Sequence, residues 1–173
     1  KDDMSKLLLE IVGEEKLQQF EKTGDLDTSI GLPGLSRIRI NAYVANEQRC
    51  LTLRILPDNL PRWQDLGLPQ PFIDLTQKHR GLVLCTGPTG SGKSTTLAAF
   101  INCILETQKR HILTIEDPIE FEFQHSNTSI IHQREVKRDT QSFASALKAA
   151  LREDPDVIYI GEMRDLETIQ LAI

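Results

Sequence analysis

Two short stretches of the chain carry residue types that could do chemistry on a phosphate compound. The first, GPTGSGKST, spans residues 87–95 and fits the pattern GxxxxGK[ST]. The second, TIEDPIEFEF, spans residues 114–123 and is rich in carboxylates. These are Glu116, Asp117, Glu120 and Glu122. Two like charges about 4 Å apart repel by roughly 4 kcal/mol at an effective dielectric constant near 20, so the carboxylates need a partner other than the phosphate itself.

Every position of the first stretch suits the binding of a triphosphate. Its glycines let backbone N–H groups turn toward phosphate oxygens, and a helix beginning at its end would add a positive dipole. Lys93 would reach the β- and γ-phosphates, and the Ser94 hydroxyl would bind Mg²⁺. An accidental Gly-rich turn is the alternative, but four specified positions recur by chance in under about one per cent of chains this long. The predicted nucleotide-binding residues are Gly87, Pro88, Thr89, Gly90, Ser91, Gly92, Lys93, Ser94 and Thr95.

A further carboxylate follows a later apolar stretch. VIYI, residues 157–160, leads into Gly161 and Glu162, where proteins with this loop place an acidic residue close to Mg²⁺. One carboxylate can hold the water shell of the metal while another orients the attacking water. Two acidic elements at the ends of two strands fit that division of roles. A solvated acidic loop, which is typical of charge runs, stays open as the alternative for Asp117 and Glu122.

The elements that must position these motifs alternate along the chain. LVLCT (82–86), HILTI (111–115) and VIYI are short apolar runs typical of buried parallel strands. A helix is predicted directly after the phosphate-binding loop, and FASALKAAL (143–151) places its apolar residues on one helical stripe. Asp165 is a plausible N-cap of a last helix. Strands alternating with helices predict an α/β fold with a parallel sheet.

The first third of the chain follows a different pattern. Residues 4–22 have helical spacing, whereas residues 36–45 and 49–56 alternate in the period of strands and predict an antiparallel hairpin. Prolines then break the pattern and mark a domain boundary. The predicted divisions are a partial small α+β domain over 1–57, a linker over 58–63 and a P-loop core over 64–173.

Composition argues against several classes of protein, although a local basic face for nucleic acid stays open. A chain of 173 residues with a net charge of −5 has no electrostatic attraction to nucleic acid or to an anionic membrane. No apolar run approaches the roughly 20 residues that span a bilayer. Cys50, Cys85 and Cys103 have neither zinc-ligand nor CxxC spacing. Because Cys85 lies in an apolar run and Cys103 in a predicted amphipathic helix, buried thiols in a reducing compartment are expected rather than a metal site or a disulfide.

Four blocks in this order resemble the secretion ATPases and, within them, the type IV pilus retraction ATPases of twitching motility. The blocks are GPTGSGKSTTLAA, ILTIEDPIEF, HQREV and ALREDPDVIYIGEMRDLETI. The segment RIRINAY…LRILP also resembles the end of the PAS-like domain of that family. The resemblance covers almost the whole chain. It implies a P-loop NTPase core with a RecA-like parallel sheet and helices on both faces, preceded by part of a smaller PAS-like α+β domain.

The resemblance also implies a function and roles for particular residues. It implies a bacterial, cytoplasmic homo-hexamer that hydrolyses ATP with Mg²⁺ and works with an inner-membrane pilus platform protein to retract pili. In that family the acidic block supplies the carboxylate that activates water, here Glu120, and Glu162 helps to hold Mg²⁺. Glu116 is implied as a further acid of the site. Arg39 and Arg54 match arginines that reach the triphosphate, although outward charges on an exposed strand face remain the alternative.

Some features of the family lie outside the given residues, and other functions stay open. A histidine-containing box and a helical domain follow the GEMRD block in the family, so we expect the chain to be truncated at both ends. His79, His111, His125 and His132 precede that block and are predicted to be structural or exposed. A pilus-extension or type II secretion ATPase shares these blocks. A nucleic-acid translocase is disfavoured by the net charge, and a non-catalytic partner is disfavoured by the intact phosphate loop and carboxylates.

Overall fold

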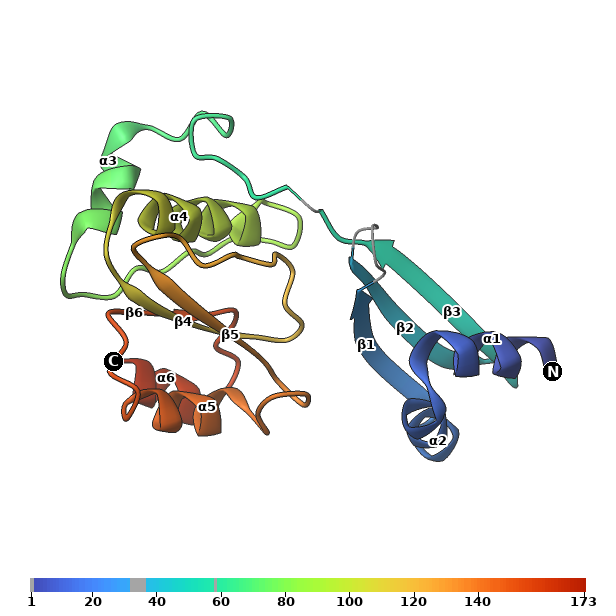
Figure 1. Ribbon diagram of the computed structural model, residues 1–173. Coiled ribbons are helices and arrows are strands. Elements are labelled where there is room, and N and C mark those ends of the chain that lie inside the picture. Colours follow the sequence, from blue (N-terminus) through green and yellow to red (C-terminus); the bar gives the residue numbers. More distant parts are fainter. Residues whose placement is uncertain (1, 32–36, 58) are drawn as a thin grey trace. The chain divides into compact units, whose positions relative to one another are not determined.

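The computed structural model describes residues 2–31, 37–57 and 59–173. It divides into two compact units, Lys1–Asp58 and Asn59–Ile173 (Figure 1). Each unit has its own sheet and its own apolar core. Two residues named in the sequence predictions, Ser36 at the start of the hairpin and Asp58 in the linker, lie outside the described residues.

The first unit is an antiparallel sheet with two helices. Its elements are α1 (Asp2–Val12), α2 (Glu14–Thr23), β1 (Asp25–Gly31), β2 (Arg37–Ala45) and β3 (Gln48–Ile55). The strand order is β1-β2-β3, and both pairings are antiparallel. The predicted helices and the predicted hairpin are therefore confirmed, whereas β1 was not predicted.

Apolar residues hold the helices of the first unit against its sheet. Leu8 of α1 and Phe20 of α2 are buried with Leu26 and Ala42 of the strands. Helix α2 ends at Gly24, whose φ of 76° is a left-handed conformation that glycine adopts without a steric penalty. Its backbone N–H donates to the Phe20 carbonyl and so satisfies one of the last carbonyls of the helix.

The second unit contains a parallel sheet and carries both motifs. Its elements are α3 (Gln70–Asp74), a 3₁₀ turn (Leu75–Gln77), α4 (Lys93–Thr107), β4 (His111–Glu116), β5 (Ile130–Glu135), α5 (Phe143–Ala150), β6 (Val157–Ile160) and α6 (Leu166–Ala172). The strand order is β5-β4-β6, with both pairings parallel. The predicted strands at HILTI and VIYI and the predicted helices are confirmed, and Asp165 does cap α6 by accepting from the Thr168 N–H at 2.7 Å.

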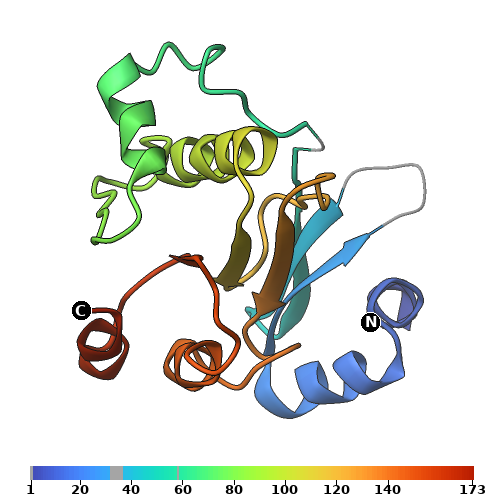
Figure 2. The same ribbon diagram turned by 60° about the vertical axis from the view of Figure 1, so that its left-hand side comes forward.

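Helices cover both faces of this parallel sheet, as predicted. Helix α4 lies on one side of the strands, and α5 and α6 lie on the other (Figures 1 and 2). Successive residues of a strand point to opposite faces, so Ile112 packs with Ile101 of α4. Ile115 packs with Leu147 of α5 and Leu171 of α6. Strand β4 is therefore buried on both faces and paired on both edges.

The prediction of a buried strand at LVLCT is wrong. Residues 82–86 form no strand, and Leu82, Val83 and Leu84 are 52%, 48% and 59% exposed. The run is apolar enough for a buried strand, but a strand also needs a neighbour for its backbone N–H and C=O groups. Among the described residues β4 has β5 and β6 on its two edges, and 82–86 pairs with neither. An apolar run alone does not supply that partner.

Candidate nucleotide-binding site

The glycine-rich loop turns directly into the start of α4. Gly92 has a φ of 88° and is the N-cap of α4, which runs for 15 residues from Lys93. No side chain caps this helix end, so its first-turn N–H groups, which lack partners within the helix, are available to an anion. At Gly87 an added Cβ would lie 2.8 Å from the Ser91 Oγ. A side chain there would displace the Ser91 hydroxyl and would need a φ of 155°, which residues other than glycine rarely adopt.

The Lys93 ammonium lies over the loop. Its Nζ donates to the carbonyl oxygens of Gly87 and Pro88, each at 2.9 Å. The side chain is therefore held at the loop by contacts that a phosphate oxygen could replace, since a charge-assisted bond to an anion is stronger than one to a neutral carbonyl. Ser94, the predicted Mg²⁺ ligand, is half-buried in the first turn of α4.

The loop lies at the same end of the sheet as the acidic residues. Only residues 108–110 connect the end of α4 to the start of β4, so α4, packed on the sheet, runs antiparallel to that strand. The start of α4 and the loop before it therefore lie toward the carboxyl end of β4. Tyr159 of β6 gives a second indication. Burial raises the pKa of its phenol, and the nearby charges of Glu116 and Glu120, then Cys85, raise it further. Cys85 precedes the loop by two residues, so the two motifs approach each other around Tyr159.

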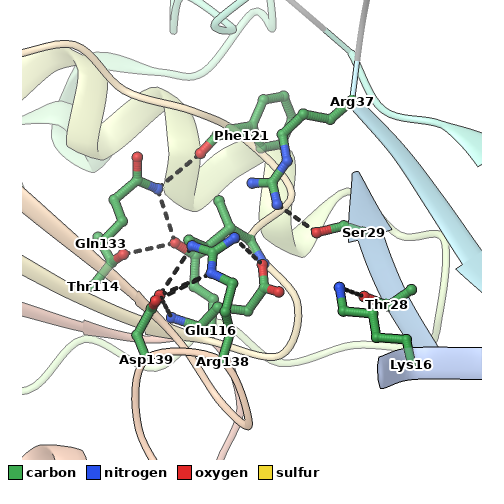
Figure 3. A network of polar contacts seen from close by, with 12 residues as sticks. Lys16, Thr28, Ser29, Arg37, Thr114, Glu116, Phe121, Gln133, Arg138 and Asp139 are labelled. Carbon is green, nitrogen blue, oxygen red and sulfur yellow. Dashed lines mark hydrogen bonds and ion pairs between the residues drawn. The ribbon is translucent and has the colours of Figure 1, made fainter. Parts of the chain in front are cut away.

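The carboxylate of Glu116 is buried at the end of β4 and is 5% exposed. Its Oε1 accepts from the Thr114 Oγ1 at 2.7 Å and from the Gln133 Nε2 at 3.2 Å (Figure 3). Burial raises the pKa of the Glu116 carboxyl, and these hydrogen bonds and one from the backbone of Glu120 oppose that rise. The negative charge of Glu120 raises it as well. Glu116 is thus an acid whose charged form is disfavoured by its surroundings.

The other acids of the block differ in their surroundings. Glu120 is half-buried and lies close enough to Glu116 to act on its pKa. Asp117 and Glu122 are exposed, and the Asp117 Oδ2 lies 3.8 Å from the Lys137 Nζ. The structure thus brings Glu116 and Glu120 together and leaves Asp117 and Glu122 at the surface. Their role as solvated charges remains a prediction.

Glu162 follows β6, beside the strand that ends at Glu116. The backbone between them is tight, since a Cβ on Gly161 would lie 3.3 Å from the Ile115 carbonyl oxygen and 3.4 Å from the Glu116 Cα. The Glu162 Oε2 lies 2.8 Å from the NH2 of Arg164, whose side chain is 81% exposed. An ion pair with so exposed a partner is weak, so the carboxylate can exchange that partner for a metal or its water.

Arg39 and Arg54 belong to the first unit, where they are directly opposite each other in the β2–β3 register. Arg39 forms a two-point ion pair with Asp27, with its NH2 2.6 Å from Oδ2 and its Nε 3.1 Å from Oδ1. Arg54 is exposed. That either reaches a triphosphate stays a prediction.

Among the cysteines and histidines, Cys85 lies near the two motifs, two residues before the glycine-rich loop. Cys103 is buried as expected, but Cys85 is only half-buried because the run around it forms no strand. The rings of His111 and His132 meet at the start of β4 and along β5, with Nε2 of the first 3.0 Å from Nδ1 of the second. Within residues 2–31, 37–57 and 59–173 no group of three or more His, Cys, Asp or Glu side chains could hold a metal ion. A metal here would therefore need further ligands, such as phosphate and water.

Sequence reasoning did not identify four residues that build the site: Thr114, Gln133, Tyr159 and Gly161. Thr114 carried a signal, because it is a polar residue inside an apolar strand and such a residue needs a hydrogen-bond partner. Gln133 lies in the HQREV block, whose role depends on the pairing of β5 with β4. Pairing between distant segments has no local signature.

A phosphate-binding loop before a helix, on a parallel α/β sheet with carboxylates at the strand ends, defines a P-loop nucleotide-binding protein. Residues 25–173 match the family described as "Type II/IV secretion system protein". The chain therefore belongs to this family, and its second unit has the RecA-like α/β fold of its ATPases.

Two known proteins and one solved structure are similar to almost the whole chain. The chain is 47% identical over 167 residues to the "Type IV pilus retractation ATPase PilT" of Pseudomonas aeruginosa, covering 96% of this chain and 48% of that protein. It is 46% identical over 172 residues to the "Twitching motility protein" of Neisseria gonorrhoeae, covering 99% and 46%. The crystal structure of "the Pilus Retraction Motor PilT and Bound ADP" aligns with a TM-score of 0.93 at 50% identity, covering 97% and 49%. The chain spans about half the length of the curated relatives it matches.

Replacing Glu116 by Gln should stabilise the fold at neutral and alkaline pH. The raised pKa means that ionised Glu116 costs stability, and this cost appears as pH rises above the ordinary value of 4.5. A neutral amide can still accept from Thr114 without that cost. Urea unfolding of Glu116→Gln and wild type at pH 8 and at pH 4 should show a gain at pH 8 that shrinks at pH 4. Lower stability of the variant at pH 8 would contradict the conclusion that the surroundings of Glu116 disfavour its ionised form.

Proposed function

We propose that the protein is an Mg²⁺-dependent ATPase, a motor that drives the retraction of type IV pili. The observation that carries the proposal is that two carboxylates, Glu116 and Glu120, and the segment that leads into the phosphate-binding loop all lie around Tyr159 of β6. The names of the two relatives, a pilus retraction ATPase and a twitching motility protein, support the coupling to pili.

Residues 87–95 would bind the phosphates of a nucleoside triphosphate. The uncapped start of α4 offers backbone N–H groups, and Lys93 offers the mobile cation. The Ser94 hydroxyl and the Glu162 carboxylate would hold Mg²⁺, partly through water, as is usual for a metal that keeps several water ligands. Bound Mg²⁺ would neutralise charge on the phosphates during transfer.

The acidic residues then divide the remaining tasks. Glu120 would accept the proton of the attacking water, and the buried Glu116 lies close to it. Because Glu116 resists ionisation, the pair can hold one negative charge more easily than two. We assign Glu120 the role of general base and Glu116 that of a supporting acid.

The rest of the proposal concerns assembly and place in the cell. We propose a homo-hexamer in the bacterial cytoplasm that acts at the inner face of the inner membrane through a pilus platform protein. None of the helices in the described residues is long and apolar enough to cross a membrane. Attachment through a partner is compatible with this finding.

Glu120→Gln should lower ATP turnover by the full-length protein by roughly 10²–10⁴, the usual effect of removing a positioned base. The amide keeps the shape of the side chain and loses the proton acceptor, so affinity for Mg²⁺·ATP should change by no more than a few-fold. Glu122→Gln is the matched control, two residues away and exposed, and should turn over normally. Normal turnover of Glu120→Gln together with an inactive Glu162→Gln would show that Glu162 is the general base and that Glu120 is not.

Deletion of the gene in a bacterium that carries it distinguishes retraction from extension. A retraction motor removes subunits from a fibre, so cells without it should keep surface pili and lose twitching motility. A pilus-extension ATPase would leave cells without pili, and a type II secretion ATPase would leave pili intact and block protein export. Electron microscopy of the surface and a motility assay on agar measure both outcomes.

A further inference from the structure

We propose that Gln133 is a positioning residue, which holds the acidic loop of residues 117–123 and the Glu116 carboxylate in one arrangement for ATP hydrolysis. This inference rests on the proposed function. Gln133 lies on β5, opposite Thr114 in the parallel register, and its side chain contacts the same carboxylate as Thr114 (Figure 3).

Both the nitrogen and the oxygen of the Gln133 side-chain amide form hydrogen bonds. Its Nε2 donates to the Glu116 Oε1 at 3.2 Å and to the Phe121 carbonyl at 2.9 Å, and its Oε1 accepts from the Phe123 N–H at 2.8 Å. A flipped amide would set its oxygen against a carboxylate and a carbonyl, and its NH₂ against an N–H. Only one orientation satisfies all three partners, so the side chain is fixed.

The same strand holds the loop at a second point. Glu135, two residues further along β5, accepts from the Ile119 N–H through its Oε2 at 3.2 Å, and that oxygen also lies 3.4 Å from NH1 of Arg138. The loop is therefore bound to β5 at Ile119, Phe121 and Phe123. Phe121 and Phe123 are also buried in the cluster beneath α4.

These anchors determine where the carboxylates lie. Glu120 is placed between the anchored residues Ile119 and Phe121 and is half-buried near Glu116. Glu122 is placed between Phe121 and Phe123 and is exposed. Without Gln133, two backbone groups and the Glu116 carboxylate would each lose a partner, and buried groups left unpaired force a rearrangement. A displacement of about 1 Å at a reacting group can cost up to roughly 10²-fold in rate.

The test is ATP hydrolysis by full-length Gln133→Met, which keeps the length of the side chain and removes its polar atoms. We expect kcat to fall by roughly 10–100-fold, with KM and ADP affinity unchanged within about threefold because the phosphate loop is untouched. Gln124→Met is the matched control on an exposed residue near the loop and should behave as wild type.

Gln133→Glu is a second, isosteric variant that tests the inference if Gln133→Met does not fold. It keeps the acceptor for the Phe123 N–H but replaces both donated bonds by a negative charge beside Glu116, so kcat should fall at least as far. Turnover within twofold of wild type in the folded variants, or a loss that appears in KM and ADP affinity rather than in kcat, would overturn the role of Gln133. If Glu120→Gln were still inactive, the proposed function would stand. A wild-type protein that does not hydrolyse ATP would overturn the proposed function and this inference with it.

Discussion

The burial of one carboxylate, that of Glu116, constrains the residues around it more than any other feature of the second unit. An ionised carboxylate away from water costs several kcal/mol unless hydrogen bonds compensate. The donors come from Thr114 on the same strand and Gln133 on the next one. Gly161, directly after β6, leaves room for the backbone of Ile115 and Glu116. The polar Thr114 in an apolar strand is thus a consequence of this carboxylate, whereas Gly161 accommodates the close approach of the backbone at Ile115 and Glu116.

The same constraint explains why acidic residues follow a phosphate-binding loop so closely. Backbone N–H groups at the start of α4 and the Lys93 ammonium suit the anion. The carboxylates at the ends of β4 and β6 suit the metal and the water instead. Hydrogen bonds from β5 hold the acidic loop at three residues, Ile119, Phe121 and Phe123. In the proposed site the carboxylates would face the metal and the water, so their repulsion with the phosphates would be limited.

Local sequence patterns predicted the helices and strands whose own residues show a clear apolar pattern or a capping residue. Strands β4 and β6 are short apolar runs, α5 has one apolar stripe, and Asp165 caps α6. The proposed phosphate-binding residues need no partner from elsewhere in the chain to be predicted, because they occupy nine consecutive positions. Residues 82–86 were mispredicted because a strand depends on a partner elsewhere in the chain. Gln133 was missed for the same reason, since its role arises only when β5 pairs with β4.

The central claim is that the phosphate-binding loop and the acidic loop, which are distant in sequence, form one nucleotide site. Hydrogen–deuterium exchange of backbone amides with and without Mg²⁺·ATP tests it directly, because it reports on both segments in one experiment. The account predicts slower exchange in residues 87–95 and in residues 116–123 when the nucleotide is bound. Protection confined to residues 87–95, or absent from both segments, would contradict it.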